Sequence, residues 1–161
     1  MAETSDSGLK CLLLPLQTGT LLLPNSVVAE IVPAQRHHGA GGVQPHWCVG
    51  RIEWRGMSVP LISLESLHDG QAREFPNKTS FVVLHRLQES ADADDYYAVC
   101  IDGIPHFQFL DETLLESLDS DPENPYVAHE ARLDGATVLI PDLDALEAQI
   151  ATLNLPAADP A

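Results

Sequence analysis

Basic residues are scarce in this sequence, and their scarcity argues against two classes of ligand. The 161-residue chain has 8 Lys and Arg against 24 Asp and Glu, which gives a formal net charge of −16 at pH 7. After Arg86, a single basic residue, Arg132, opposes seventeen carboxylates. Nucleic acids and anionic membranes are bound by clustered Lys and Arg, so we expect neither as a ligand. The acidic excess favours solubility, with steering of a basic partner as the alternative.

We also expect neither a leader nor a membrane-spanning segment. The N-terminus, M-A-E-T-S-D-S, is acidic where a signal peptide needs positive charge, and no segment approaches the ~18 apolar residues of a membrane-spanning helix. The few cysteines, Cys11, Cys48 and Cys100, are far apart, and each falls in an apolar, strand-like run. This placement predicts reduced, partly buried thiols. We therefore expect a cytoplasmic protein.

Sequence motifs of common catalytic sites are absent as well. The sequence has no G-x-S-x-G elbow, phosphate-binding loop, dinucleotide fingerprint or H-E-x-x-H helix. Asp92, Asp94 and Asp95 lack the glycine and the final glutamate of a calcium loop, so they predict a solvated turn. No catalytic constellation stands out, so an enzyme is the least supported class of function.

One group of residues has the composition of a metal site. His37, His38, His46 and Cys48 supply four nitrogen or sulfur ligands within twelve positions. Adjacent histidines on a flexible, glycine-rich loop rarely bind one ion, and the C-x-x-C pairs of structural zinc sites are missing. We therefore expect a surface loop over residues 33–46, and a metal-responsive protein remains an alternative.

The most informative stretch of the chain is residues 47–67, W-C-V-G-R-I-E-W-R-G-M-S-V-P-L-I-S-L-E-S-L. Apolar and charged side chains alternate from Arg51 to Arg55, and an apolar run follows from Met57 to Ile62, which predicts a β-hairpin with its corner at Gly56. Pro60 lacks a backbone donor, so the second arm is expected to be a sheet edge or to carry a bulge near Pro60. The charged face is a candidate docking surface for another protein; a solvated strand is the alternative.

Short strand patterns recur along the whole chain. Helical turns are expected at 24–26 and 64–67, a short helix capped by Asp111 at 111–117, and a longer helix capped by Asp142 at 143–153. The pattern favours small barrels or a sandwich whose halves, divided near residue 78, share a core that the last helix helps to cover. Further strands are expected at 11–16, 20–23, 30–32, 81–87, 96–101, 104–110, 127–133 and 136–140, with corners at 17–19, 102–103 and 134–135.

Four segments of the sequence resemble the CheW-type chemosensory adaptors. Residues 50–64, G-R-I-E-W-R-G-M-S-V-P-L-I-S-L, are similar to that family's G-x-x-N-x-R-G-x-x-x-P motif, which aliphatic residues and an Asp-Leu pair follow. The similarity extends to L-L-L-P-N-S-V-V-A-E-I upstream, and to Y-Y-A-V-C-I-D-G-I and L-D-G-A-T-V-L-I-P-D-L-D-A-L downstream. In all, the resemblance covers about residues 9–154.

The resemblance implies a mainly β fold of two small five-stranded β-barrel subdomains, side by side, with a C-terminal helix. The expected domain is 9–154, with subdomains at about 9–78 and 79–141, the helix at about 142–154, and flexible tails at 1–8 and 155–161. It also implies a non-enzymatic scaffold with no cofactor.

The family's partners are the regulatory domain of a CheA-type histidine kinase and the cytoplasmic tip of a chemoreceptor. The resemblance therefore implies a cytoplasmic adaptor recruited to membrane-associated receptor clusters. It gives Arg55 the position of the motif's functional arginine, Glu30 that of its ion-pair partner, and Val28 that of a kinase contact. With Glu53 and Gly56 these residues form the expected partner-binding set. The alternative for Glu30 and Arg55 is that both simply face water.

The sequence also departs from the family pattern. Glu53 replaces the motif asparagine, Ser63 replaces the aspartate, and Pro105-His106-Phe107 stands where the family has a plainer strand facing the receptor. Such divergence resembles the auxiliary adaptors of type IV pilus chemosensory systems, which implies control of twitching motility. A general β-barrel module that binds a peptide at the Pro60 edge, unrelated to chemosensing, is the alternative function.

Overall fold

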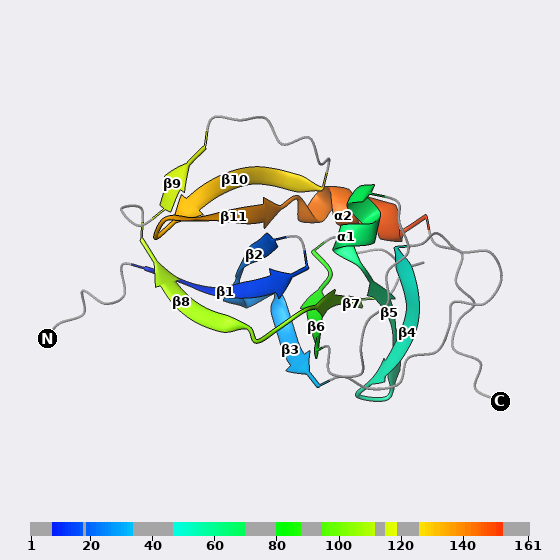
Figure 1. The fold of residues 1–161 in the computed structure, drawn as a ribbon. Helices are drawn as coiled ribbons and strands as arrows, with labels where there is room; N and C mark the ends of the chain where they lie inside the picture. Colours follow the sequence, from blue (N-terminus) through cyan, green and yellow to red (C-terminus); the bar gives the residue numbers. More distant parts are fainter. Residues whose placement is uncertain are drawn as a thin grey trace, which may run out of the picture.

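The computed structural model describes residues 8–17, 19–33, 47–69, 80–87, 95–111, 115–118 and 126–152, whose strands form two curled sheets side by side (Figure 1). The six-stranded sheet has the order β8 (His106–Leu110), β1 (Leu9–Leu16), β2 (Gly19–Pro24), β11 (Ala136–Pro141), β10 (Val127–Leu133) and β9 (Leu115–Ser117). The five-stranded sheet has the order β3 (Val28–Val32), β6 (Ser80–His85), β7 (Tyr96–Ile101), β5 (Met57–Ile62) and β4 (Cys48–Trp54).

Among the described residues, three short helical segments accompany the sheets: the 3₁₀ turn η2 (Asn25–Val27), α1 (Leu64–Asp69) and α2 (Leu143–Ile150). The predicted cap of the last helix is present, since Asp142 Oδ1 accepts a hydrogen bond from the backbone N–H of Ala145 at 3.0 Å. Within the described ranges, no helix is both long and apolar enough to cross a membrane.

Two hairpins close with the same kind of two-residue turn. In the β10–β11 hairpin, Asp134 and Gly135 have φ values of 52° and 83°; in the β4–β5 hairpin, Arg55 and Gly56 have 51° and 78°. Two consecutive positive φ angles match the twist of the flanking strands, and both hairpins lie where the sequence predicts them. The predicted corner at Gly56 thus includes Arg55, which also adopts a positive φ.

Each sheet combines strands from both halves of the sequence. β1 and β2 pair with strands that follow residue 105, and β6 and β7 join strands that precede residue 63. The two halves therefore exchange strands, and the limit expected near residue 78 does not coincide with the division between the sheets.

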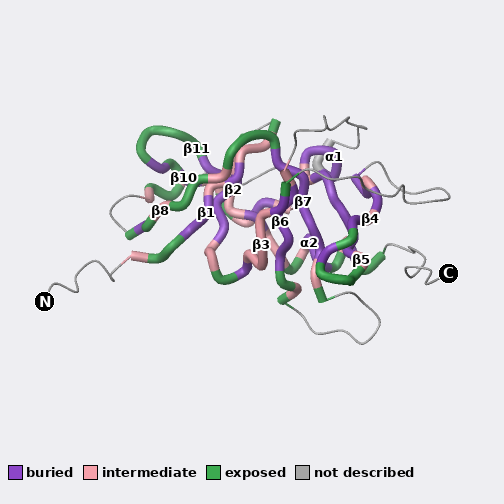
Figure 2. The backbone as a smooth tube through the Cα atoms, turned by 90° about the horizontal axis from the view of Figure 1, so that it is seen from below, coloured by how far each residue is buried: buried purple, intermediate pink, exposed green. Residues whose placement is uncertain are grey.

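The apolar core has three parts. The largest lies between the two sheets, where α2 contributes Leu146 and Ile150. A second part fills the curl of the five-stranded sheet and takes residues from all five of its strands, and a third, smaller part lies inside the six-stranded sheet. Figure 2 shows the buried segments gathered in the middle of the molecule, between exposed turns. The two sheets are thus held together mainly by shared apolar burial.

Two buried carboxylates add polar contacts between the sheets. Glu65 in α1 accepts a hydrogen bond from the backbone N–H of Gln17, beside the β1–β2 turn, at 2.9 Å. Glu147 in α2 accepts one from the backbone N–H of Leu87, just beyond β6, at 2.8 Å, and its Oε2 lies 3.5 Å from the Tyr97 hydroxyl. Burial, together with the charge of Glu147, raises the pKa of Tyr97, so the hydroxyl keeps its proton and can donate a hydrogen bond to Glu147.

Three predictions about the secondary structure are wrong. The first is the hairpin at Asp102-Gly103, since β7 pairs with β5 and β6 whereas β8 pairs with β1. These two residues instead carry the chain from one sheet to the other. Gly103 has a φ of 131°, and a Cβ atom there would lie 2.9 Å from Pro15 Cγ, so glycine is needed for close approach rather than for a tight hairpin.

The second wrong prediction is the helix at 111–117. Residues 115–117 form β9, which pairs with β10 so that Leu115 lies opposite Leu133. Capping by Asp111 is a local preference, and the cross-strand burial of Leu115 outweighs it. Residues 112–114 lie outside the described part of the chain.

The third wrong prediction concerns the arm that contains Pro60. β5 is an interior strand between β4 and β7, and the edge strand is β4. The pairing of β5 with β7 begins at Leu61, one position after Pro60, so the missing N–H removes no bond from that ladder. The alternative, a bulge in this arm near Pro60, is wrong as well, because the register shift between Cys48 and Gly50 places the extra residue on β4, opposite Leu61 and Ile62.

Candidate protein-binding surface

The predicted pair of Glu30 and Arg55 is present, although the two residues are not on neighbouring strands. Glu30 lies on β3 and Arg55 follows β4, and these two strands are the opposite edges of the five-stranded sheet. The curl of the sheet brings the edges together, and Arg55 Nη2 donates to Glu30 Oε1 at 2.7 Å. Both side chains are accessible, with 66% of Arg55 and 40% of Glu30 exposed. The pair therefore spans the gap between the two edge strands and still faces solvent.

A buried tryptophan supports this pair from below. Trp54, the last residue of β4, is only 5% exposed. Its Nε1 lies 3.4 Å from Glu30 Oε1, and its ring centroid lies 4.8 Å from Arg55 Cζ. The ring also meets Tyr96 edge to face, with 4.8 Å between centroids. Sequence reasoning treated Trp54 only as an apolar residue of the hairpin; the signal it missed is the indole N–H, which needs an acceptor when the ring is buried.

The other predicted partner-binding residues surround the pair at different depths. Glu53 is exposed on β4, in register with Ser58. Gly56 is exposed at the turn, and nothing lies within 4 Å of a Cβ atom placed there. Val28 is half-buried, opposite Leu84, and packs against the core between the sheets. Val28 thus offers only part of its side chain to a partner.

Two further residues singled out in the sequence are part of the core. Ser63 is fully buried, and its Oγ accepts a hydrogen bond from the backbone N–H of Ser66 at 3.2 Å at the start of α1. Serine and aspartate are both good helix caps, so this departure from the family motif keeps the cap. Cys48 is buried between the sheets, and His37, His38 and His46 lie outside the described residues.

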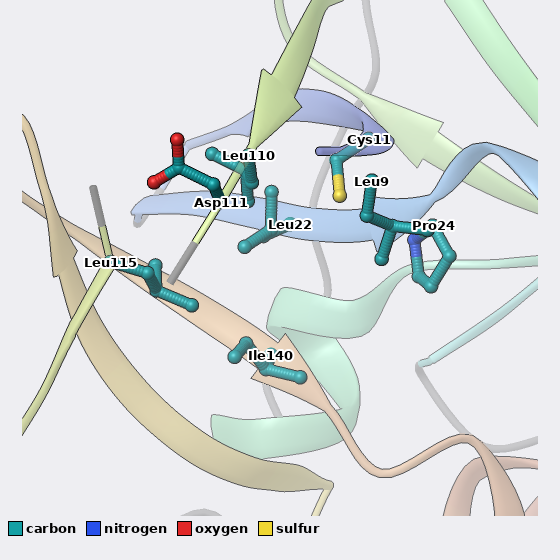
Figure 3. Close-up of a pocket in the computed structure, with 8 residues that line it drawn as sticks. All are labelled: Leu9, Cys11, Leu22, Pro24, Leu110, Asp111, Leu115 and Ile140. Carbon is teal, nitrogen blue, oxygen red and sulfur yellow. The ribbon is translucent and has the colours of Figure 1, made fainter. Parts of the chain in front are cut away.

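The largely apolar cavity inside the six-stranded sheet is a weaker candidate site. It measures about 510 Å³ and is lined by residues of β1, β2, β8, β9 and β11. In Figure 3 the sulfur of Cys11 points into the cavity, while the Asp111 carboxylate lies at its margin. Small-molecule sites combine apolar walls with several convergent polar groups, and this lining offers one carboxylate.

Burial limits the chemistry of the cysteines. All three are buried free thiols, as the sequence predicts, and burial raises the pKa of both Cys48 and Cys100. Raised pKa values keep these thiols protonated, which is the unreactive form. The described residues contain no group of three or more side chains able to hold a metal ion. The accessible chemistry that stands out is therefore the charged pair at the β4–β5 turn.

Two curled sheets with a shared core and an exposed ion pair define a mainly β protein whose best-formed surface feature suits recognition of another protein. The sequence matches the CheW-like domain over residues 10–150, so the chain belongs to the CheW-like family. This membership confirms the family predicted from the hairpin motif.

The fold agrees with a solved member of the family. The scaffolding protein TtCheW from Thermoanaerobacter tengcongensis superimposes with a TM-score of 0.70 at 17% sequence identity, over 89% of this chain and 90% of the other. A comparison with curated proteins gave no match. The mainly β, CheW-like fold with a C-terminal helix is therefore confirmed, with six strands in one sheet and five in the other among the described residues.

Proposed function

We propose that this protein is a non-enzymatic adaptor that couples a chemoreceptor to a CheA-type histidine kinase in membrane-associated receptor clusters. Its family supports a chemosensory adaptor role. The observation that carries the proposal is the accessible side chain of Arg55, which has the position of the family's functional arginine. Its Nη2 lies 2.7 Å from Glu30 Oε1. We assign the kinase regulatory domain to this surface.

The backbone at Arg55 supports a role beyond the turn itself. Asp134 and Arg55 occupy equivalent positions in two turns with nearly equal φ values, 52° and 51°. Aspartate tolerates this left-handed conformation because its short side chain can form a local hydrogen bond. Arginine has no such compensation, and the conformation destabilises the backbone there by about 1 kcal/mol. Turn geometry therefore does not explain an arginine at residue 55. Strain of this kind is typical of functional positions.

A second exposed surface fits the receptor. Phe107 and Phe109 on the edge strand β8 are 57% and 61% exposed, and Lys10 Nζ lies 4.7 Å from the centroid of the Phe107 ring. The β1–β8 register places Lys10 opposite Phe109 and the buried Leu12 opposite Phe107, so both rings lie on the face that continues into the core between the sheets. Exposed apolar rings next to one cation suit an amphipathic, partly acidic partner. We assign the receptor tip to this face.

The test of the proposed function is reconstitution from three purified components: this chain, the regulatory domain of the cognate kinase and a soluble receptor-tip fragment. We expect each binary complex and the ternary complex in size-exclusion chromatography with light scattering. Failure to bind both components, at concentrations up to about 100 μM, would contradict the proposal. A kinase complex without a receptor complex would overturn only the assignment of β8.

Phe107→Ser or Phe109→Ser is expected to weaken receptor binding about tenfold or more, because a few aromatic side chains contribute most of the binding energy of an apolar interface. Kinase binding should not change, and the melting temperature should stay close to that of the wild type because both rings are exposed. The matched control is Leu87→Ser, which removes an exposed apolar side chain away from β8 (50% exposed). Titration by isothermal calorimetry gives both affinities; an equal loss in the Leu87 variant would argue against a specific receptor surface.

The output that we propose for the pathway is twitching motility, on the basis of the departures at Glu53 and Pro105-His106-Phe107. Deleting the gene should then reduce twitching zones and leave swimming zones unchanged. The opposite pattern would assign the adaptor to a flagellar pathway. The alternative of a peptide-binding module at the Pro60 edge loses its site, since β5 is an interior strand.

A further inference from the structure

We propose that Trp54 is the positioning residue of the kinase-facing surface, and that it holds Arg55 ready for a carboxylate of the partner. The inference rests on the proposed kinase-binding role of Arg55. It goes beyond that role by naming the residue that orients the arginine and the chemical group that the arginine receives.

Trp54 contacts both members of the ion pair at once. Its indole Nε1 and Arg55 Nη2 are within 3.4 and 2.7 Å of the same atom, Glu30 Oε1. Rotating the Glu30 carboxylate away would lose both contacts. The indole ring also stands 4.8 Å from Arg55 Cζ, a cation–π distance. Trp54 thus restrains Glu30 through its indole N–H and Arg55 through the face of its ring.

The indole itself is held firmly. Trp54 belongs to the apolar cluster inside the five-stranded sheet, and its ring packs edge to face against Tyr96 at 4.8 Å. Tyr96 in turn contacts His85, with ring centroids 5.3 Å apart. A 5% exposed ring on this row of aromatic side chains is a rigid base under a side chain that is 66% exposed. A free arginine side chain loses rotamer entropy when a partner fixes it, so prior restraint by Trp54 reduces the entropic cost of binding.

The restrained arginine keeps donors for a partner. The contacts that Arg55 makes with the described residues use Nη2 and the face of the guanidinium group. Nη2 has a second N–H beside the one given to Glu30, and together with Nε or Nη1 it forms a pair of parallel donors that matches the two oxygens of a carboxylate. The chemistry therefore favours an Asp or Glu side chain of the kinase domain.

The experiment compares Trp54→Phe, which keeps a ring and removes the N–H, with Trp47→Phe, which makes the same change at the buried tryptophan in the core between the sheets. We expect Trp54→Phe to weaken binding to the kinase regulatory domain about threefold to tenfold, the effect of one lost hydrogen bond, and Trp47→Phe to leave binding unchanged. Trp54→Phe should also change the salt dependence of the dissociation constant. In a double-mutant cycle, Glu30→Gln should reduce the binding free energy less in the Trp54→Phe variant than it does in the wild-type chain.

A second readout needs no partner. In ¹⁵N-labelled wild-type chain, the indole N–H signal of Trp54 and the Nε–H signal of Arg55 are recorded by NMR; Glu30→Gln should shift the first, and Trp54→Phe the second. Unmoved signals, or kinase binding of Trp54→Phe equal to that of the wild type, would overturn the positioning role. If the wild-type chain does not bind the kinase domain, the proposed function fails, whereas the NMR shifts still decide whether Trp54 holds the pair.

Discussion

Asparagine at residue 55 is expected to abolish association with the kinase regulatory domain and to leave the folded chain at least as stable as the wild type. Arg55 has a φ of 51°, a conformation that asparagine adopts readily, so the change relieves about 1 kcal/mol of backbone strain. The exposed ion pair with Glu30 contributes only about 0.2 to 1 kcal/mol, so the two effects nearly cancel. Removing one member of a charge pair across an interface weakens binding at least about thirtyfold.

Two variants make this prediction specific. Arg55→Glu should also abolish binding in a pull-down, with a melting temperature close to that of the wild type. Asp134→Asn makes a comparable change at the matching turn of the β10–β11 hairpin and should alter neither binding nor stability. A large loss of stability in Arg55→Asn would show that the arginine is a structural residue.

Replacing Glu147 with alanine is expected to reduce the free energy of unfolding by about 3 kcal/mol, because it leaves the buried Tyr97 hydroxyl and the partly buried Leu87 N–H without their acceptor. Glu147 is fully buried, and it accepts from the backbone N–H of Leu87 at 2.8 Å. The bond joins α2, which follows the six-stranded sheet, to the end of β6 in the five-stranded sheet. Urea denaturation followed by circular dichroism measures the loss.

The control for Glu147 is Glu116→Ala, since Glu116 is exposed on β9 and its loss should change stability by less than about 0.5 kcal/mol. Tyr97→Phe removes the second donor near Glu147. This change should therefore reduce the free energy of unfolding less in the Glu147→Ala variant than in the wild-type chain. Equal stability of Glu147→Ala and Glu116→Ala would contradict the structural role of the buried carboxylate.

Local patterns in the sequence predicted much of the fold. Alternation predicted the β4–β5 and β10–β11 hairpins, and Asp142 predicted the start of α2, because turns and caps depend on a few adjacent residues. The pairing of β8 with β1 could not be predicted in this way, since about a hundred residues separate the two strands. Asp102-Gly103 has the composition of a hairpin corner, and only the pairing of β7 and β8 with strands of different sheets shows otherwise.

The candidate site was predicted in part, for the same reason. The family motif identified Glu30 and Arg55 as a pair, and the structure confirms their contact. Trp54 was missed because the role of its indole N–H depends on the curl that brings β3 to β4. The buried Glu65 and Glu147 were missed because a charged residue on a helix is usually solvated.

The mixing of early and late strands in each sheet has a consequence during synthesis. β1 and β2 leave the ribosome well before their neighbours β8 and β11, which lie roughly a hundred residues downstream. At about 5 to 20 residues per second, the nascent hairpin waits several seconds with its leucines uncovered. These leucines are therefore open to aggregation until β8 and β11 have also been synthesised.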